Sequence, residues 1–133
     1  MDAHVKTVVH SCTEASDQGR ISFGEVVRQL IEVGIERYHA DLVRSEKTYY
    51  LPDGSSEVVP SRAIPVQPAR ELSAAGVEAA VRAAQSGAIK YQTFCERALD
   101  AGCVGYLVSM SGKRVVYYGR TGDSHVEWFP GAR

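Results

Sequence analysis

The sequence predicts an α+β protein with an internal duplication. A helix-helix-strand-strand-strand unit occurs twice, and an antiparallel sheet packs against the helices with approximate two-fold symmetry. Three observations support this expectation. The chain aligns with itself at an offset of 68 residues without gaps, apolar residues recur first at helical and then at strand spacing, and glycines occupy equivalent positions where the spacing changes.

The self-alignment is densest between residues 15 and 58, where ten residues are identical to the residue 68 positions later. Equivalent positions do the same structural job, so a difference between equivalents is a clue to function. The identities include Gly34 with Gly102, Tyr38 with Tyr106, and Tyr49-Tyr50 with Tyr117-Tyr118.

Each half is expected to begin with two helices. Apolar stripes at helical spacing cover residues 5–12, 23–31, 77–84 and 91–99. Serines precede the second and third stripes as N-caps, and a glycine follows each stripe as a stop. These caps and stops are Ser22 and Ser73, and Gly19, Gly34, Gly87 and Gly102.

Three strands are expected after the helices of each half, because the apolar period changes there from 3.6 to 2. The first strand of each half has one mostly apolar face, expected to press against the helices: Glu36, Tyr38, Ala40 and Leu42, with their equivalents Val104, Tyr106, Val108 and Met110. The second strands are expected at 47–51 and 114–118, and the third at 56–59 and 124–129. The pattern leaves open whether the two halves share one continuous sheet.

We expect a single domain over residues 1–133, made of repeats 1–60 and 69–133 and joined by a proline-rich linker at 61–68.

The formal charge of −1 gives no overall attraction to nucleic acid or to an anionic membrane. The chain start has no signal-peptide pattern, and no apolar run is long enough to span a bilayer, so a cytoplasmic protein is expected. Cys12, Cys95 and Cys103 have apolar equivalents and are expected in the core.

Several motifs, in order and at matching spacing, resemble the YbcV-like family of small bacterial proteins. They are Gly34 to Leu42, Lys47 to Tyr50, Tyr117 to Gly122, and His125 to Glu127. Some members of that family are prophage-borne, and they are often labelled phage envelope proteins. The resemblance covers essentially the whole chain and implies no particular activity, cofactor or site residue.

The two halves differ most on the other face of the first strand. Arg37, His39 and Asp41 alternate there, whereas their equivalents are Gly105, Leu107 and Ser109. The trio is a candidate binding surface, or His39 and Asp41 form an acid–base pair, or the face is simply solvated.

The paired tyrosines Tyr49-Tyr50 and Tyr117-Tyr118 are further candidates, because each pair places one ring on either face of the sheet. These rings fill the core or line a pocket for a small planar or apolar ligand. His125 is the last candidate. With Glu127, His39 and Asp41 it has residue types that bind metals, although nothing in the sequence fixes their distances, and we expect neither a metal nor a cofactor.

The sequence does not specify a function. A non-enzymatic module that binds a small molecule or a protein, at the sheet face or in a cleft between the repeats, fits these features best. The alternative is a small enzyme that uses the pair of His39 and Asp41. The identity of the ligand or protein partner and the oligomeric state are left open.

Overall fold

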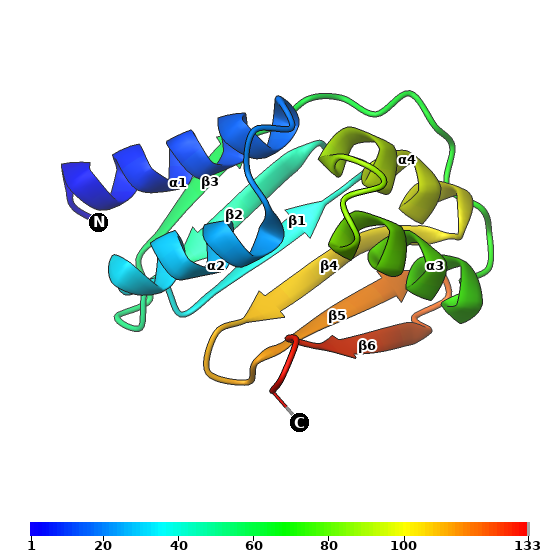
Figure 1. Ribbon diagram of the computed structural model, residues 1–133. Coiled ribbons are helices and arrows are strands. Elements are labelled where there is room, and N and C mark those ends of the chain that lie inside the picture. Colours follow the sequence, from blue (N-terminus) through cyan, green and yellow to red (C-terminus); the bar gives the residue numbers. More distant parts are fainter. Residues whose placement is uncertain (133) are drawn as a thin grey trace.

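A computed structural model describes residues 1–132, which form four helices and six strands (Figure 1). The first half contains α1 (Ala3–Asp17), α2 (Phe23–Glu32), β1 (Arg37–Asp41), β2 (Glu46–Tyr50) and β3 (Ser56–Pro60). The second half contains α3 (Ala74–Gln85), α4 (Tyr91–Asp100), β4 (Cys103–Ser109), β5 (Arg114–Gly119) and β6 (Ser124–Trp128). The α+β class with an antiparallel sheet is confirmed, while the duplication itself stays a prediction from the sequence.

The six strands form one antiparallel sheet in the order β3-β2-β1-β4-β5-β6. The two halves therefore join through β1 and β4, a point that the sequence left open. In this pairing His39 lies opposite Leu107, which is its equivalent at the offset of 68 residues. An axis that relates the two halves would pass between these two residues.

The helices lie on one face of the sheet, with α1 and α2 over the first half and α3 and α4 over the second (Figure 1). Asp2, Ser22 and Ser73 cap α1, α2 and α3, and each side chain accepts a hydrogen bond from a backbone N–H in the first turn. The two serine caps expected from the sequence are thus present. Lys90 occupies the N-cap position of α4, and its side chain forms no capping hydrogen bond.

The core lies between the helices and the inner face of the sheet. Tyr38, Ala40 and Tyr49 are buried on this face, and the outer neighbours in β1 and β2 are half-exposed, as strand alternation requires. The three cysteines are free and buried, as expected. Val104 differs from expectation and is only half-buried, because the register shifts between Cys103 and Gly105 and Cys103 enters the core instead.

Gly34 and Gly102 end the second helix of each half, and both have positive φ, +84° and +87°. This backbone region suits glycine, because it costs other residues about 1–2 kcal/mol. The surroundings of the two glycines differ. A Cβ on Gly34 would lie 3.8 Å from its nearest neighbour, Leu51, whereas a Cβ on Gly102 would collide with the backbone carbonyl of Glu71.

We therefore expect Gly102→Ala to lower the free energy of unfolding by about 3–5 kcal/mol, because backbone strain and a collision with backbone atoms combine. The matched variant Gly34→Ala meets only the strain and is expected to lose about 1–2 kcal/mol. Urea unfolding of the two variants checks this difference. Equal losses would show that the segment before α3 does not pack against Gly102 in this way.

Candidate functional site

A cavity of about 570 Å³ lies between the helices and the inner face of the sheet. Both halves line it, often with equivalent residues, including Gly19 with Gly87 and Ile21 with Ile89. The cavity therefore lies between the two halves of the chain, where the sequence analysis suggested a cleft between the repeats.

Aromatic side chains form much of the cavity wall. The rings of Tyr106 and Tyr117 lie 5.5 Å apart, and the ring of Phe94 lies 6.1 Å from that of Tyr117. Such tilted arrangements are the favourable geometries for aromatic pairs. The aromatic residues that line the cavity are Phe23, Tyr38, Tyr91, Phe94, Tyr106, Tyr117, Trp128 and Phe129.

One cation, Lys47, lies among these rings. Its side chain comes from β2 on the inner face, and the residue is only 3% exposed. The Nζ atom lies 4.3 Å from the centre of the Tyr91 ring and 5.9 Å from that of Tyr38, within the range of cation–π attraction. No ion pair between Lys47 and a carboxylate occurs within residues 1–132. Burial lowers the pKa of the ammonium below its ordinary value.

Hydroxyl groups near Lys47 add polar points to the wall. The Tyr91 and Tyr106 hydroxyl oxygens are hydrogen-bonded to each other at 2.8 Å. Burial raises the pKa of both hydroxyls well above the ordinary value, so both stay protonated at neutral pH. The cavity thus combines an apolar, aromatic surface with the buried ammonium of Lys47 and a small number of hydroxyl groups.

A carboxylate, Glu127, lines the cavity from β6. It accepts hydrogen bonds from His125 Nε2 at 2.6 Å and Arg82 Nη1 at 2.9 Å. Burial alone would raise the pKa of the Glu127 carboxyl, but these two hydrogen bonds outweigh burial and hold the pKa below its ordinary value. Glu127 also lines an open depression of about 500 Å³ beside α3, so it separates the two spaces.

Arg37, His39 and Asp41 lie on the opposite, outer face of the sheet. The Arg37 guanidinium lies 4.1 Å from the centre of the Tyr50 ring, and His39 Nε2 is 2.7 Å from the Tyr118 hydroxyl. The Asp41 carboxylate accepts hydrogen bonds from the backbone N–H groups of the turn that follows β1. No hydrogen bond joins His39 to Asp41 in the described part of the chain.

Gly105 explains why Tyr118 reaches His39. A Cβ at position 105 would collide with the Tyr118 hydroxyl, so only glycine lets this ring lie across β4 toward β1. At the equivalent position in the first half, Arg37 instead stacks on Tyr50. The outer face is therefore asymmetric, but Arg37 and His39 contact tyrosines of the same face, and Asp41 caps a turn.

The predicted site residues thus divide between the two faces. Tyr117 lines the cavity, and Tyr49 is fully buried with its hydroxyl 2.8 Å from Thr13 Oγ1. The trio, Tyr50 and Tyr118 lie outside the cavity, and a binding role for them stays a prediction. His39 and His125 lie on opposite faces, so the structure does not bring together the four residues considered for a metal.

Lys47 and Tyr91 were not among the residues selected from the sequence. A signal for Lys47 was present, because it alternates with Tyr49 on an apolar strand face and its equivalent is Val115. A charged residue on such a face is an exception that the comparison of halves would have revealed.

At pH 7, we expect Lys47→Met to raise the free energy of unfolding by about 1–3 kcal/mol, because an apolar side chain replaces a buried charge. The pKa of Lys47 is lower in the folded chain than in the unfolded chain, so the folded protein releases this proton first as the pH rises. The advantage of the variant should therefore shrink toward about pH 10.

Urea unfolding of both proteins at about pH 7 and about pH 9.5 measures this trend. Lys90→Met is the matched control, because Lys90 borders the same cavity but is exposed, and its stability should change by less than about 0.5 kcal/mol. A difference for Lys47→Met that stays constant or grows with pH would contradict a buried ammonium.

None of the helices within residues 1–132 is both long and apolar enough to cross a membrane. No curated protein matches the chain at a significant level. The profile of one family, described as "Protein of unknown function (DUF1398)", matches residues 23–126, which run from the start of α2 into β6 and include most of the cavity lining. The chain therefore belongs to the DUF1398 family.

Proposed function

We propose that this protein binds a small organic anion with an aromatic or apolar body, of the aryl carboxylate type, in the cavity between its two halves. The observation that carries the proposal is the buried Lys47 ammonium within an aromatic cavity, which forms no ion pair with a carboxylate among residues 1–132. The protein acts as a binding module and not as an enzyme.

The size and wall of the cavity suit a small molecule. Its volume of about 570 Å³ lies within the usual range for ligand pockets, which are mostly apolar with a few polar groups. Phe23 lines the cavity and is 42% exposed, so the cavity reaches the surface beside α2. There Phe23 meets Phe129 edge to face, with ring centres 5.7 Å apart.

The charge of Lys47 indicates the ligand class. A buried ammonium has lost much of its hydration, and a ligand carboxylate would restore the lost interaction through a charge-assisted hydrogen bond. The Tyr91 ring already occupies one side of the ammonium. A planar ligand can place its own ring among Tyr38, Tyr106 and Tyr117 while its carboxylate reaches Lys47.

The enzyme alternative with His39 and Asp41 is not proposed, because the Asp41 carboxylate caps a turn and is not hydrogen-bonded to His39. The cytoplasmic location and the bacterial, prophage-related setting of the YbcV-like resemblance stay part of this proposal. Neither of them rests on the cavity, and only the bacterial, prophage-related setting rests on the motifs of the resemblance.

The test compares matched probes that differ only in charge, 2-naphthylacetate and 2-naphthylacetamide, by isothermal titration calorimetry. We expect the native protein to bind the carboxylate at least about tenfold more tightly than the amide, which is about 1.4 kcal/mol. Lys47→Met should abolish this preference, whereas the rim variant Lys90→Met should keep it.

Three outcomes count against the proposal. Equal affinity for the two probes would show that the negative charge of the ligand does not contribute to binding. If Lys47→Met still prefers the carboxylate probe, a cation other than Lys47 binds that carboxylate. No saturable binding of these probes, nor of a wider panel of aryl carboxylates, would show that the cavity does not take this class of ligand.

A further inference from the structure

We propose that Glu78, His125 and Glu127 form a binding site for a divalent transition-metal ion, with Zn²⁺ as the preferred ion. Each of the three side chains offers one ligand atom, and these atoms all lie within 4.8 Å of one another. An imidazole nitrogen with two carboxylate oxygens is a donor set for zinc and its neighbours, whereas calcium and magnesium prefer oxygen alone. The proposal does not rest on the ligand proposed for the cavity, although Glu127 lines both spaces.

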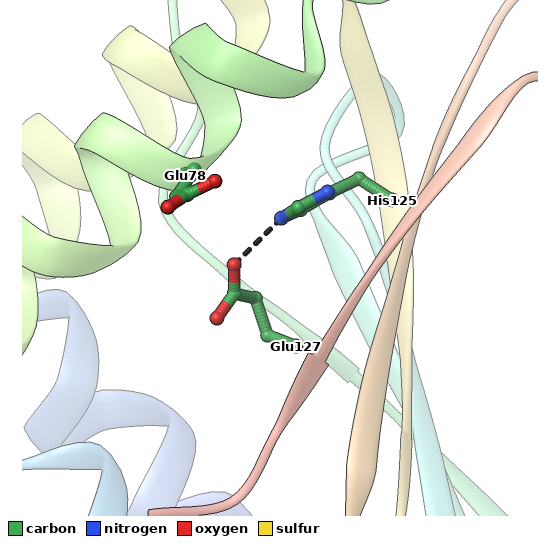
Figure 2. Close-up of side chains that lie close together, drawn as sticks. All are labelled: Glu78, His125 and Glu127. Atoms are coloured by element: carbon green, nitrogen blue, oxygen red, sulfur yellow. Dashed lines mark hydrogen bonds and ion pairs between the residues drawn. The ribbon is translucent and has the colours of Figure 1, made fainter.

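Two regular elements hold the three ligands. Helix α3 presents Glu78, and β6 presents His125 and Glu127 two residues apart, on the same face of the strand. Figure 2 shows the three side chains pointing into one space between the helix and the strand. Ligands on a helix and a strand are held more precisely than ligands on loops.

The hydrogen bonds of Glu127 leave one oxygen directed toward this space. Its Oε1 accepts from Arg82 Nη1 at 2.9 Å, while its Oε2 faces His125 Nε2 at 2.6 Å. A metal bound by Oε2, Nε2 and a Glu78 oxygen would replace the histidine contact and leave the Arg82 contact in place. Arg82 would then orient the ligating carboxylate, as outer hydrogen-bond partners do at metal sites.

The burial of the three ligands and the access of solvent to them suit a metal site with an open coordination position. The side chains of Glu127 and His125 are 10% and 18% exposed, whereas Glu78 is 53% exposed. All three line the open depression of about 500 Å³ beside α3. Three protein ligands at an open depression leave a coordination position for water or another small molecule, as in catalytic rather than structural zinc sites.

The first half of the chain provides an internal comparison. The equivalents of Glu78 and His125 are His10 and Glu57, which form a hydrogen bond of 2.8 Å between α1 and β3. In the first half, a histidine–glutamate pair alone links the helix to the strand, without a third ligand. The equivalent of Glu127 is Val59, which is 3% exposed, so packing at this position does not require a carboxylate. The second half adds the third ligand.

The experiment titrates the metal-stripped full chain with ZnCl₂ by calorimetry, and the Co²⁺ form is followed by its visible absorption. We expect one Zn²⁺ per chain, weaker binding of Mn²⁺, and Co²⁺ bands typical of mixed nitrogen and oxygen ligands. Glu78→Gln, at an exposed position, should weaken Zn²⁺ binding at least about tenfold without loss of fold. Glu127→Val, which imitates Val59, should weaken it similarly.

Glu57→Gln is the matched control, because it removes the carboxylate of the equivalent pair in the first half, and it should leave Zn²⁺ affinity unchanged. The proposal is overturned if no Zn²⁺ binds, if Glu78→Gln and Glu127→Val bind as the native chain does, or if Glu57→Gln is the variant that loses binding. Loss in both site variants with an unchanged Glu57→Gln supports it.

Discussion

The pairing of β1 with β4 is the interaction on which the rest of the structure depends. It joins two three-stranded halves into one sheet of six strands, and it places His39 opposite its own equivalent, Leu107. Backbone hydrogen bonds extend the join beyond the strand ends, from Leu42 N–H to the Val104 carbonyl and from Met110 N–H to the Glu36 carbonyl. Because two short meanders alone expose much apolar surface, we infer that each half needs the other to complete its core.

This arrangement also creates the cavity. The helix pairs of the two halves pack on the same face of one sheet, and the cavity lies between the helices and that face. Equivalent residues of the two halves line this cavity. Where two equivalents differ, a charged side chain can therefore enter a largely apolar space. Lys47 in place of a valine equivalent adds an ammonium, and Glu127 in place of Val59 adds a carboxylate. Burial disfavours the charge of Lys47, whereas hydrogen bonds from His125 and Arg82 favour the charge of Glu127.

Much of the fold could be predicted from the sequence, because its signals are local. The serine caps, the glycine stops and the change of apolar period at Gly34 and Gly102 each act within a few residues. The site could be predicted only in part. Alternation showed that Arg37, His39 and Asp41 share the face away from the helices, but not that Arg37 lies over the Tyr50 ring or that His39 reaches the Tyr118 hydroxyl. The approach of Glu78 to His125 depends on how α3 crosses β6, and the bulge at Cys103 depends on tertiary packing.

Native-state hydrogen exchange tests most directly whether the two halves form one cooperative unit. The amides of β1 and β2 and those of β4 and β5 should exchange only through global unfolding, with free energies that agree within about 1 kcal/mol and with the same dependence on denaturant. If the strand amides of one half exchange through a separate opening of lower free energy while the other half stays protected, the β1–β4 pairing does not hold the structure together, and the cavity cannot be a stable feature of the fold.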